Sequence, residues 1–129
     1  LIAYHIMMSS DDFSILEKHK YINLETYKKN GQAVQTPVWF MISDGLIFVQ
    51  TAKNTGKVKR IKNNQTIRIM PCGMRGEPKG DWIDGKARLG DESETQKTIK
   101  LRHKKYGLKA RLIGMFMKEE GLVGIVIQI

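Results

Sequence analysis

Apolar and polar side chains alternate along much of this chain, and this two-residue period is typical of a β-strand with one buried face. Over residues 21–27 the alternation places Ile22, Leu24 and Thr26 on one face and four polar or aromatic residues on the other. Five further segments are predicted as strands from alternation or from their β-branched and aromatic residues. These segments are residues 33–42, 46–51, 66–70, 82–89 and 122–129.

Two residue pairs mark turns between the first three predicted strands. Asn30-Gly31 follows the first strand and Asp44-Gly45 follows the second. Both residues of each pair can take the positive φ that a tight hairpin turn prefers. The first three strands are therefore expected to form an antiparallel meander.

A short amphipathic helix is predicted before the first strand, and another after the third. The first opens at Asp11-Asp12 and directs apolar side chains inward, namely Phe13, Ile15 and Leu16. The second has Thr55 as its N-cap, ends at Asn63-Asn64 and places Val58 and Ile61 among basic residues.

Residues 91–106 are predicted as a longer helix, with acidic residues in its first turn and basic residues in its later turns. This order suits the helix dipole. Tyr106-Gly107 ends or bends the helix, and residues 108–117 form a second, more apolar helix. Six strands with short helices between them predict an α+β fold built on a closed antiparallel sheet. We find no repeat or linker, so a single domain over residues 1–129 is expected.

The composition restricts the classes of protein to which this chain can belong. Hydrophobic residues make up 41% of the chain, which is enough for one core, and no apolar run approaches the roughly 18 to 20 residues that span a bilayer. The chain shows no signal-peptide pattern, and it begins with Leu1, so upstream residues are expected to be missing. The single cysteine, Cys72, favours a reducing compartment, and we expect a cytoplasmic protein. The net charge of +9 indicates an anionic partner.

Four short motifs occur in a characteristic order and spacing. They are Thr36–Phe40 (TPVWF), Thr51–Ile61, the Pro71-Cys72…Arg75-Gly76 loop and Lys104–Leu108 (KKYGL). Together they resemble the split-barrel flavoproteins related to pyridoxamine 5′-phosphate oxidase, and within them the oxidoreductases that use the deazaflavin coenzyme F420. The resemblance covers the chain from about residue 20 onward. It implies a six-stranded antiparallel split β-barrel that works as a homodimer and binds coenzyme F420 or FMN at the dimer interface.

The resemblance also implies which residues contact the tricyclic ring of the cofactor. The edge of the second strand would lie along the ring, largely through main-chain contacts of Thr36, Pro37, Val38 and Trp39. Thr51 would lie near the ring or the ribityl chain. Relatives that use FMN often carry a basic residue where this chain has Gln35, which favours F420 over FMN.

The phosphate of the cofactor would be held by Thr55, Gly56 and Lys57, with Lys59 or Arg60 as a second cation. The residues themselves suit this role, because a helix N-terminus offers backbone N–H donors and Lys57 adds a charge. The alternative is an ordinary N-capped helix with a solvated basic face.

Other candidate residues are open to two interpretations. Trp39 and Trp82 could flank the ring, although core or dimer-interface packing is the usual role of a tryptophan. Arg75, on a glycine-rich loop, is either an anion contact or part of an ordinary exposed loop. The basic stretch Lys97–Arg111 is a solvated helix face or a contact for an acidic cofactor tail. Cys72 is expected to be buried and inert.

The implied chemistry is hydride transfer between the bound ring and an unidentified small molecule. No His/Asp or paired-carboxylate pattern identifies a catalytic residue, and His5, His19 and His103 are too scattered to predict a metal site. One alternative is a non-catalytic flavin- or deazaflavin-binding protein. A less favoured alternative is a nucleic-acid-binding β-barrel, because the basic residues are spread over several elements. We therefore expect neither nucleic acid nor membrane as a partner.

Overall fold

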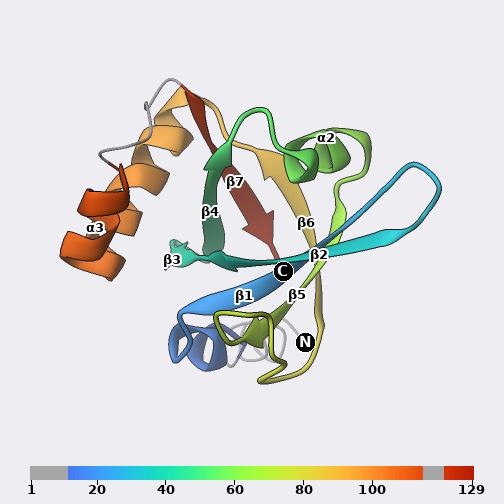
Figure 1. Cartoon of the computed structure of the whole chain (residues 1–129), viewed down its shortest axis with the longest axis horizontal. Coiled ribbons are helices and arrows are strands. Elements are labelled where there is room, and N and C mark those ends of the chain that lie inside the picture. Colours follow the sequence, from blue (N-terminus) through green and yellow to red (C-terminus); the bar gives the residue numbers. More distant parts are fainter. Residues whose placement is uncertain (1–11, 115–120) are drawn as a thin grey trace.

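A computed structural model describes residues 12–114 and 121–129, with side chains described up to residue 107 and from residue 121. Its centre is one curled antiparallel sheet with the strand order β2-β1-β5-β6-β7-β4-β3 (Figure 1). The strands are β1 (Tyr21–Tyr27), β2 (Ala33–Trp39), β3 (Met41–Ser43), β4 (Leu46–Ala52), β5 (Thr66–Cys72), β6 (Ile83–Leu89) and β7 (Leu122–Gln128). The α+β class with one antiparallel sheet is confirmed, and the sheet is a curled half-barrel that matches a split barrel.

The sheet has seven strands, and the prediction of six was wrong. The predicted strand over residues 33–42 divides at Phe40, because the chain changes its partner there. Trp39 pairs with Tyr21 of β1, whereas Met41 pairs with Phe48 of β4. The two end strands of the sheet, β2 and β3, are thus consecutive in the chain, and the junction at Phe40 brings the two sheet edges together.

The hairpin turns are where the sequence predicts them. Asp44 and Gly45 both have positive φ, at 53° and 74°. In the first hairpin only Gly31 does, at 87°, so the expectation for Asn30 was wrong. Five residues separate β1 from β2, and the Gly31 N–H donates to the Lys28 carbonyl. A turn of this length needs a left-handed residue only at its close.

The helices also follow the sequence closely. Helix α2 (Gly56–Asn63) has Thr55 as N-cap and Asn64 as C-cap, and it buries Val58 and Ile61 as predicted. Helix α3 (Glu92–Gly114) bends at Gly107, where φ is 61° and ψ is −138°. Helical backbone thus continues beyond Gly107 as expected, while residues 115–117 of the predicted second helix lie outside the described part.

The first short helix is helical over residues 12–17, and the start predicted at Asp11 lies outside the described residues. Leu16 is fully buried and Phe13 packs against the core, as predicted. Ile15 is 50% exposed, so the prediction that it points inward was wrong. In so short a helix one apolar face cannot include three residues this close together.

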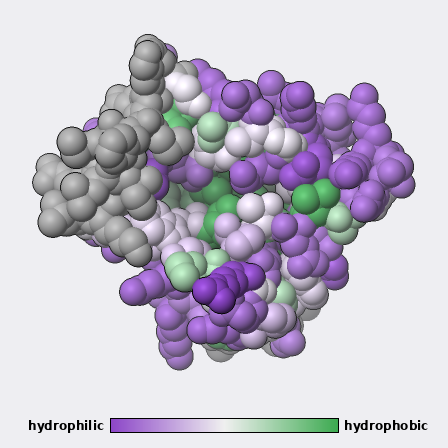
Figure 2. Space-filling model, viewed as in Figure 1, coloured by the Kyte–Doolittle hydropathy of each residue, from purple (hydrophilic) through white to green (hydrophobic). Residues whose placement is uncertain are grey.

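Two apolar clusters hold the sheet. The larger fills the concave side of the sheet, with Ile22, Leu24, Ile47, Val49, Ile67, Ile69, Ile125 and Ile127 among its members. The smaller lies on the convex side, where Phe48 and Val126 pack against Leu101 and Tyr106 of α3. Figure 2 shows apolar residues near the centre of one face, surrounded by hydrophilic ones. None of the helices in the described residues is both long and apolar enough to cross a membrane.

Candidate cofactor-binding site

The N-terminus of helix α2 presents backbone donors that no side chain caps. Thr55 occupies the N-cap position, yet its hydroxyl donates to the Ala52 carbonyl at 3.1 Å and makes no capping hydrogen bond. The first backbone N–H groups of a helix have no partner within the helix. Together with the helix dipole, these groups form a place where an anion is stabilised.

Two cations lie at this helix start. Arg60 donates from Nε to the hydroxyl of Thr26 at 2.6 Å, which anchors its side chain on the end of β1. Its guanidinium reaches back over Gly56, where an added Cβ would lie only 2.7 Å from Arg60 Nη1. Lys57 is half-buried, and its pKa is lowered by burial and then by the charge of Arg60. Within the described part of the chain, neither cation forms a salt bridge with a carboxylate.

Thr51 connects this helix start to the end of strand β4. Thr51 is buried, and its hydroxyl lies 3.4 Å from the hydroxyl of Thr55. The structure therefore brings together five of the predicted phosphate and ribityl residues, namely Thr51, Thr55, Gly56, Lys57 and Arg60. Lys59 is exposed, so Arg60 is the better placed of the two candidates for second cation.

The predicted ring-binding strand has an unpaired edge. Strand β2 pairs with β1 along its whole length and with no second strand of the described residues. Beside it lies a hollow of about 170 Å³, lined by Val38, Trp39, Met41, Gln50 and Arg102. Gln50 of the hollow and Thr51 of the polar cluster are consecutive in β4, so their side chains point to opposite faces of that strand.

The wall of the hollow is built from stacked planar groups. The rings of Trp39 and Tyr106 are parallel within 4° at a centroid distance of 4.2 Å. The guanidinium of Arg102 lies 5.1 Å from the centroid of Trp39, and burial lowers its pKa. The amide oxygen Oε1 of Gln50 is buried without a hydrogen-bond partner among the described residues. Such an atom is costly unless a ligand or water satisfies it.

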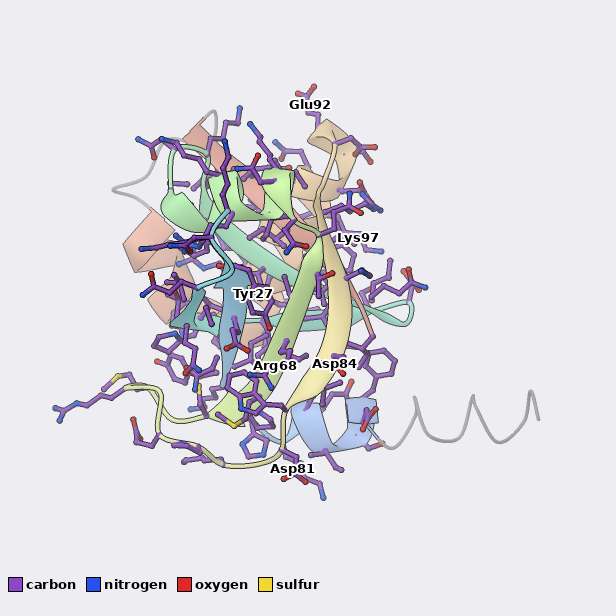
Figure 3. The ribbon with its side chains drawn as sticks, turned by 90° about the vertical axis from the view of Figure 1, so that its right-hand side faces the viewer. Tyr27, Arg68, Asp81, Asp84, Glu92 and Lys97 are labelled. Atoms are coloured by element: carbon purple, nitrogen blue, oxygen red, sulfur yellow. The ribbon has the colours of Figure 1, made fainter. Side chains whose placement is uncertain are left out.

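Two of the predicted site residues, Trp82 and Arg75, lie away from the cluster at the start of α2. The guanidinium carbon of Arg68 lies 4.5 Å from the centroid of the Trp82 ring, and Arg68 forms a salt bridge with the buried Glu25. Figure 3 shows Arg68 and Tyr27 on the same side of the sheet. Arg75 is exposed on the loop after β5, at the opposite end of the molecule from α2 (Figure 1). Neither Trp82 nor Arg75 joins the cluster at α2 within one chain.

Two residues that line the hollow, Gln50 and Arg102, and the neighbouring Tyr106 were not predicted as site residues. Arg102 belonged to the basic stretch that was expected to be a solvated helix face or a contact for an acidic cofactor tail. Tyr106 was expected only to end or bend the helix, and Gln50 was not singled out. The available signal was the four-residue spacing of Arg102 and Tyr106, which puts them on one side of a helix. Cys72 is buried as expected, and burial raises the pKa of its thiol. The described residues include no cluster of three or more metal-ligating side chains.

Comparison with known proteins identifies the family of this chain. The profile of the pyridoxamine 5′-phosphate oxidase family matches residues 12–125. This chain therefore belongs to that family, whose members commonly bind flavins such as FMN. No curated protein sequence matches the chain.

Several solved structures share the fold. The heme storage protein HutZ of Vibrio cholerae aligns with a TM-score of 0.69 at 15% identity, over 92% of this chain and 87% of its own. General Stress Protein 26 of Bacillus anthracis aligns with a TM-score of 0.67 at 16% identity, over 94% and 88%. A NimC/NimA family protein of Clostridium acetobutylicum aligns with a TM-score of 0.61 at 14% identity, over 93% and 78%. At these identities the similarity shows the fold alone.

Proposed function

We propose that this protein is an oxidoreductase that binds coenzyme F420 or FMN and transfers a hydride to or from a small molecule. The observation that carries the proposal is the start of helix α2, where uncapped backbone donors meet two cations that have no carboxylate partner among the described residues. Such a cluster is electrostatically incomplete until an anion joins it.

The phosphate would be held at this helix start. Gly56 leaves room for the Arg60 guanidinium, and Thr26 fixes that guanidinium in place. Burial, and then the charge of Arg60, lower the pKa of Lys57, and a bound phosphate would offset the repulsion between these two cations. Binding is therefore expected to raise that pKa again.

The ring would lie along β2 at the hollow between β2 and β4. Trp39, Val38 and Met41 provide apolar contacts there, and the unpartnered Gln50 oxygen can accept a hydrogen bond. The bound ring supplies the hydride chemistry, while the chain orients it and excludes water. We place F420 ahead of FMN because Gln35 stands where FMN-binding relatives often have a basic residue.

A non-catalytic cofactor-binding protein is the second candidate. No side chain lining the hollow is a histidine or carboxylate that could act as a general acid or base. The binding residues are the same in both proposals, so only turnover separates them.

The test is a fluorescence titration of the purified protein with F420 and, separately, with FMN. We expect tight binding of one cofactor, and a loss of affinity of about tenfold or more in Lys57→Ala, because one charge-assisted contact to the phosphate is removed. Lys62→Ala is the matched control, since Lys62 is exposed on the same helix and should leave affinity unchanged. If the wild-type protein binds neither cofactor, the proposed function is wrong.

A further inference from the structure

The junction between β2 and β3 is held by one tyrosine. Phe40 is fully buried at this junction and belongs to neither strand. Its backbone N–H donates to the hydroxyl of Tyr106 at 3.1 Å. Its carbonyl accepts from the Tyr106 hydroxyl and from Lys105 Nζ, each at 2.8 Å. Phe40 is the one residue between β2 and β3 and has no partner strand, so helix α3 provides the hydrogen bonds of its backbone.

The same tyrosine fixes two neighbouring groups. Its ring stacks on Trp39, and its hydroxyl also lies 2.8 Å from the carbonyl of Lys20, just before β1. It is the last residue before the bend at Gly107. Tyr106 itself does not line the hollow, whereas Val38, Trp39 and Met41, on either side of Phe40, do. Its contacts therefore set the path of the chain that forms one wall of the hollow.

We infer that Tyr106 is a positioning residue for the ring of the cofactor, and this inference rests on the proposed function. Its hydroxyl holds the backbone of Phe40, and its ring holds the side chain of Trp39. Together they place the wall against which the ring would lie. Among the described residues, Tyr106 makes no hydrogen bond to the start of helix α2, where the phosphate would be held. Loss of the hydroxyl should therefore weaken binding of the ring and leave binding of the phosphate unchanged.

The variant Tyr106→Phe separates these roles, because it keeps the stacked ring and removes only the hydroxyl. The Phe40 carbonyl retains Lys105 as donor, but the buried Phe40 N–H loses its partner. A buried N–H without a partner is unfavourable, so the junction is expected to shift. Tyr27→Phe is the matched control, since the Tyr27 hydroxyl bonds to Glu25 and not to the junction.

The experiment compares each cofactor with its phosphate-free form, using FMN with riboflavin and F420 with its dephosphorylated deazaflavin. Dissociation constants are measured by fluorescence for the pair that the wild-type protein binds. Tyr106→Phe should weaken both members of the pair by the same factor, about fivefold or more. Lys57→Ala should weaken only the phosphorylated member, and Tyr27→Phe should change neither.

Each outcome decides one of the two proposals. If the wild-type protein binds no member of either pair, the proposed function fails. If it binds and Tyr106→Phe stays within about twofold of wild type for both members, the positioning role is overturned. An effect of Tyr106→Phe on the phosphorylated member alone overturns it as well. Should Tyr106→Phe not fold, Lys105→Met tests the same junction, because it leaves both hydrogen bonds between Phe40 and Tyr106 in place. Affinity for both members should then stay within about twofold of wild type, and a larger loss for both would show that Lys105, and not Tyr106, holds the junction.

Discussion

Lys105 carries a charge that its surroundings disfavour. Much of its side chain is exposed, but the ammonium lies 3.7 Å from the centroid of the Phe40 ring and donates to the Phe40 carbonyl. Burial of this group lowers its pKa to about 8, whereas Glu17 acts in the opposite direction. The folded protein thus releases this proton more readily than the unfolded chain does.

This shift predicts a pH dependence of stability. Between about pH 8 and pH 10.5 the unfolded state binds more protons at Lys105 than the folded state, so the free energy of unfolding should rise with pH. Chemical denaturation across this range should show a rise for the wild-type protein relative to Lys105→Gln. Parallel curves for the two proteins would contradict the prediction.

Single residues also show which structural features can be predicted from neighbouring residues in the sequence. Asp44-Gly45 predicts its turn because positive φ is a property of the residues themselves. Arg102 belongs to a stretch that was expected to face solvent or an acidic cofactor tail, and its guanidinium lies against Trp39. No neighbouring residue in the sequence indicates that contact, because Trp39 is far away along the chain.

Helix α3 begins with a reciprocal cap that its sequence predicts only in part. The Glu94 N–H donates to Asp91 Oδ1 at 2.8 Å, and the Asp91 N–H donates to Glu94 Oε1 at 3.0 Å. Arg88 of β6 adds two hydrogen bonds to the Glu94 carboxylate, each 2.7 Å long. The acidic first turn was predicted, whereas the partner from β6 depends on the tertiary fold.

These contacts predict a measurable contribution of Glu94 to stability. Arg88, and then the backbone N–H of Asp91, lower the pKa of Glu94 to about 2. The contribution should be complete above about pH 4.5 and disappear as the pH falls toward 2. Glu94→Ala should lower the free energy of unfolding by about 1 kcal/mol at neutral pH, measured by urea denaturation.

Glu92→Ala is the control for this cap. Glu92 stands in the same first turn but is exposed and makes no side-chain hydrogen bond among the described residues. Its removal should have little effect on stability. Equal losses in the two variants would show that the general charge of the turn, and not the cap, stabilises α3.

In the part of the chain that the structure describes, β2 has an unpaired edge beside the hollow. Free backbone groups on an edge strand favour pairing or coverage by another chain, and a chain of 129 residues leaves much surface unburied. We propose that the protein is a homodimer in which a second copy covers this region. Analytical ultracentrifugation should give twice the mass of one chain, and cofactor titration should give one site per chain. A monomer that binds cofactor with full affinity would refute this assembly.

At the scale of the fold, the sequence by itself determined the features that depend on residues close together in the chain. These are the alternation of β1, the two hairpins, the ends of α2 and the bend after Tyr106. Propensity, capping and turn conformation act over a few residues, so a single sequence contains them. The family motifs likewise indicated the antiparallel half-barrel.

Only the tertiary structure decided which distant residues meet. The predicted strand over residues 33–42 divides because Phe40 bonds to Tyr106, 66 positions away. Thr26 orients Arg60 across 34 positions, whereas Trp82 and Arg75 lie away from the cluster at α2. Such contacts depend on how the sheet curls and which of its faces each helix covers. No local pattern of residues encodes that geometry, because it arises from packing of the whole chain.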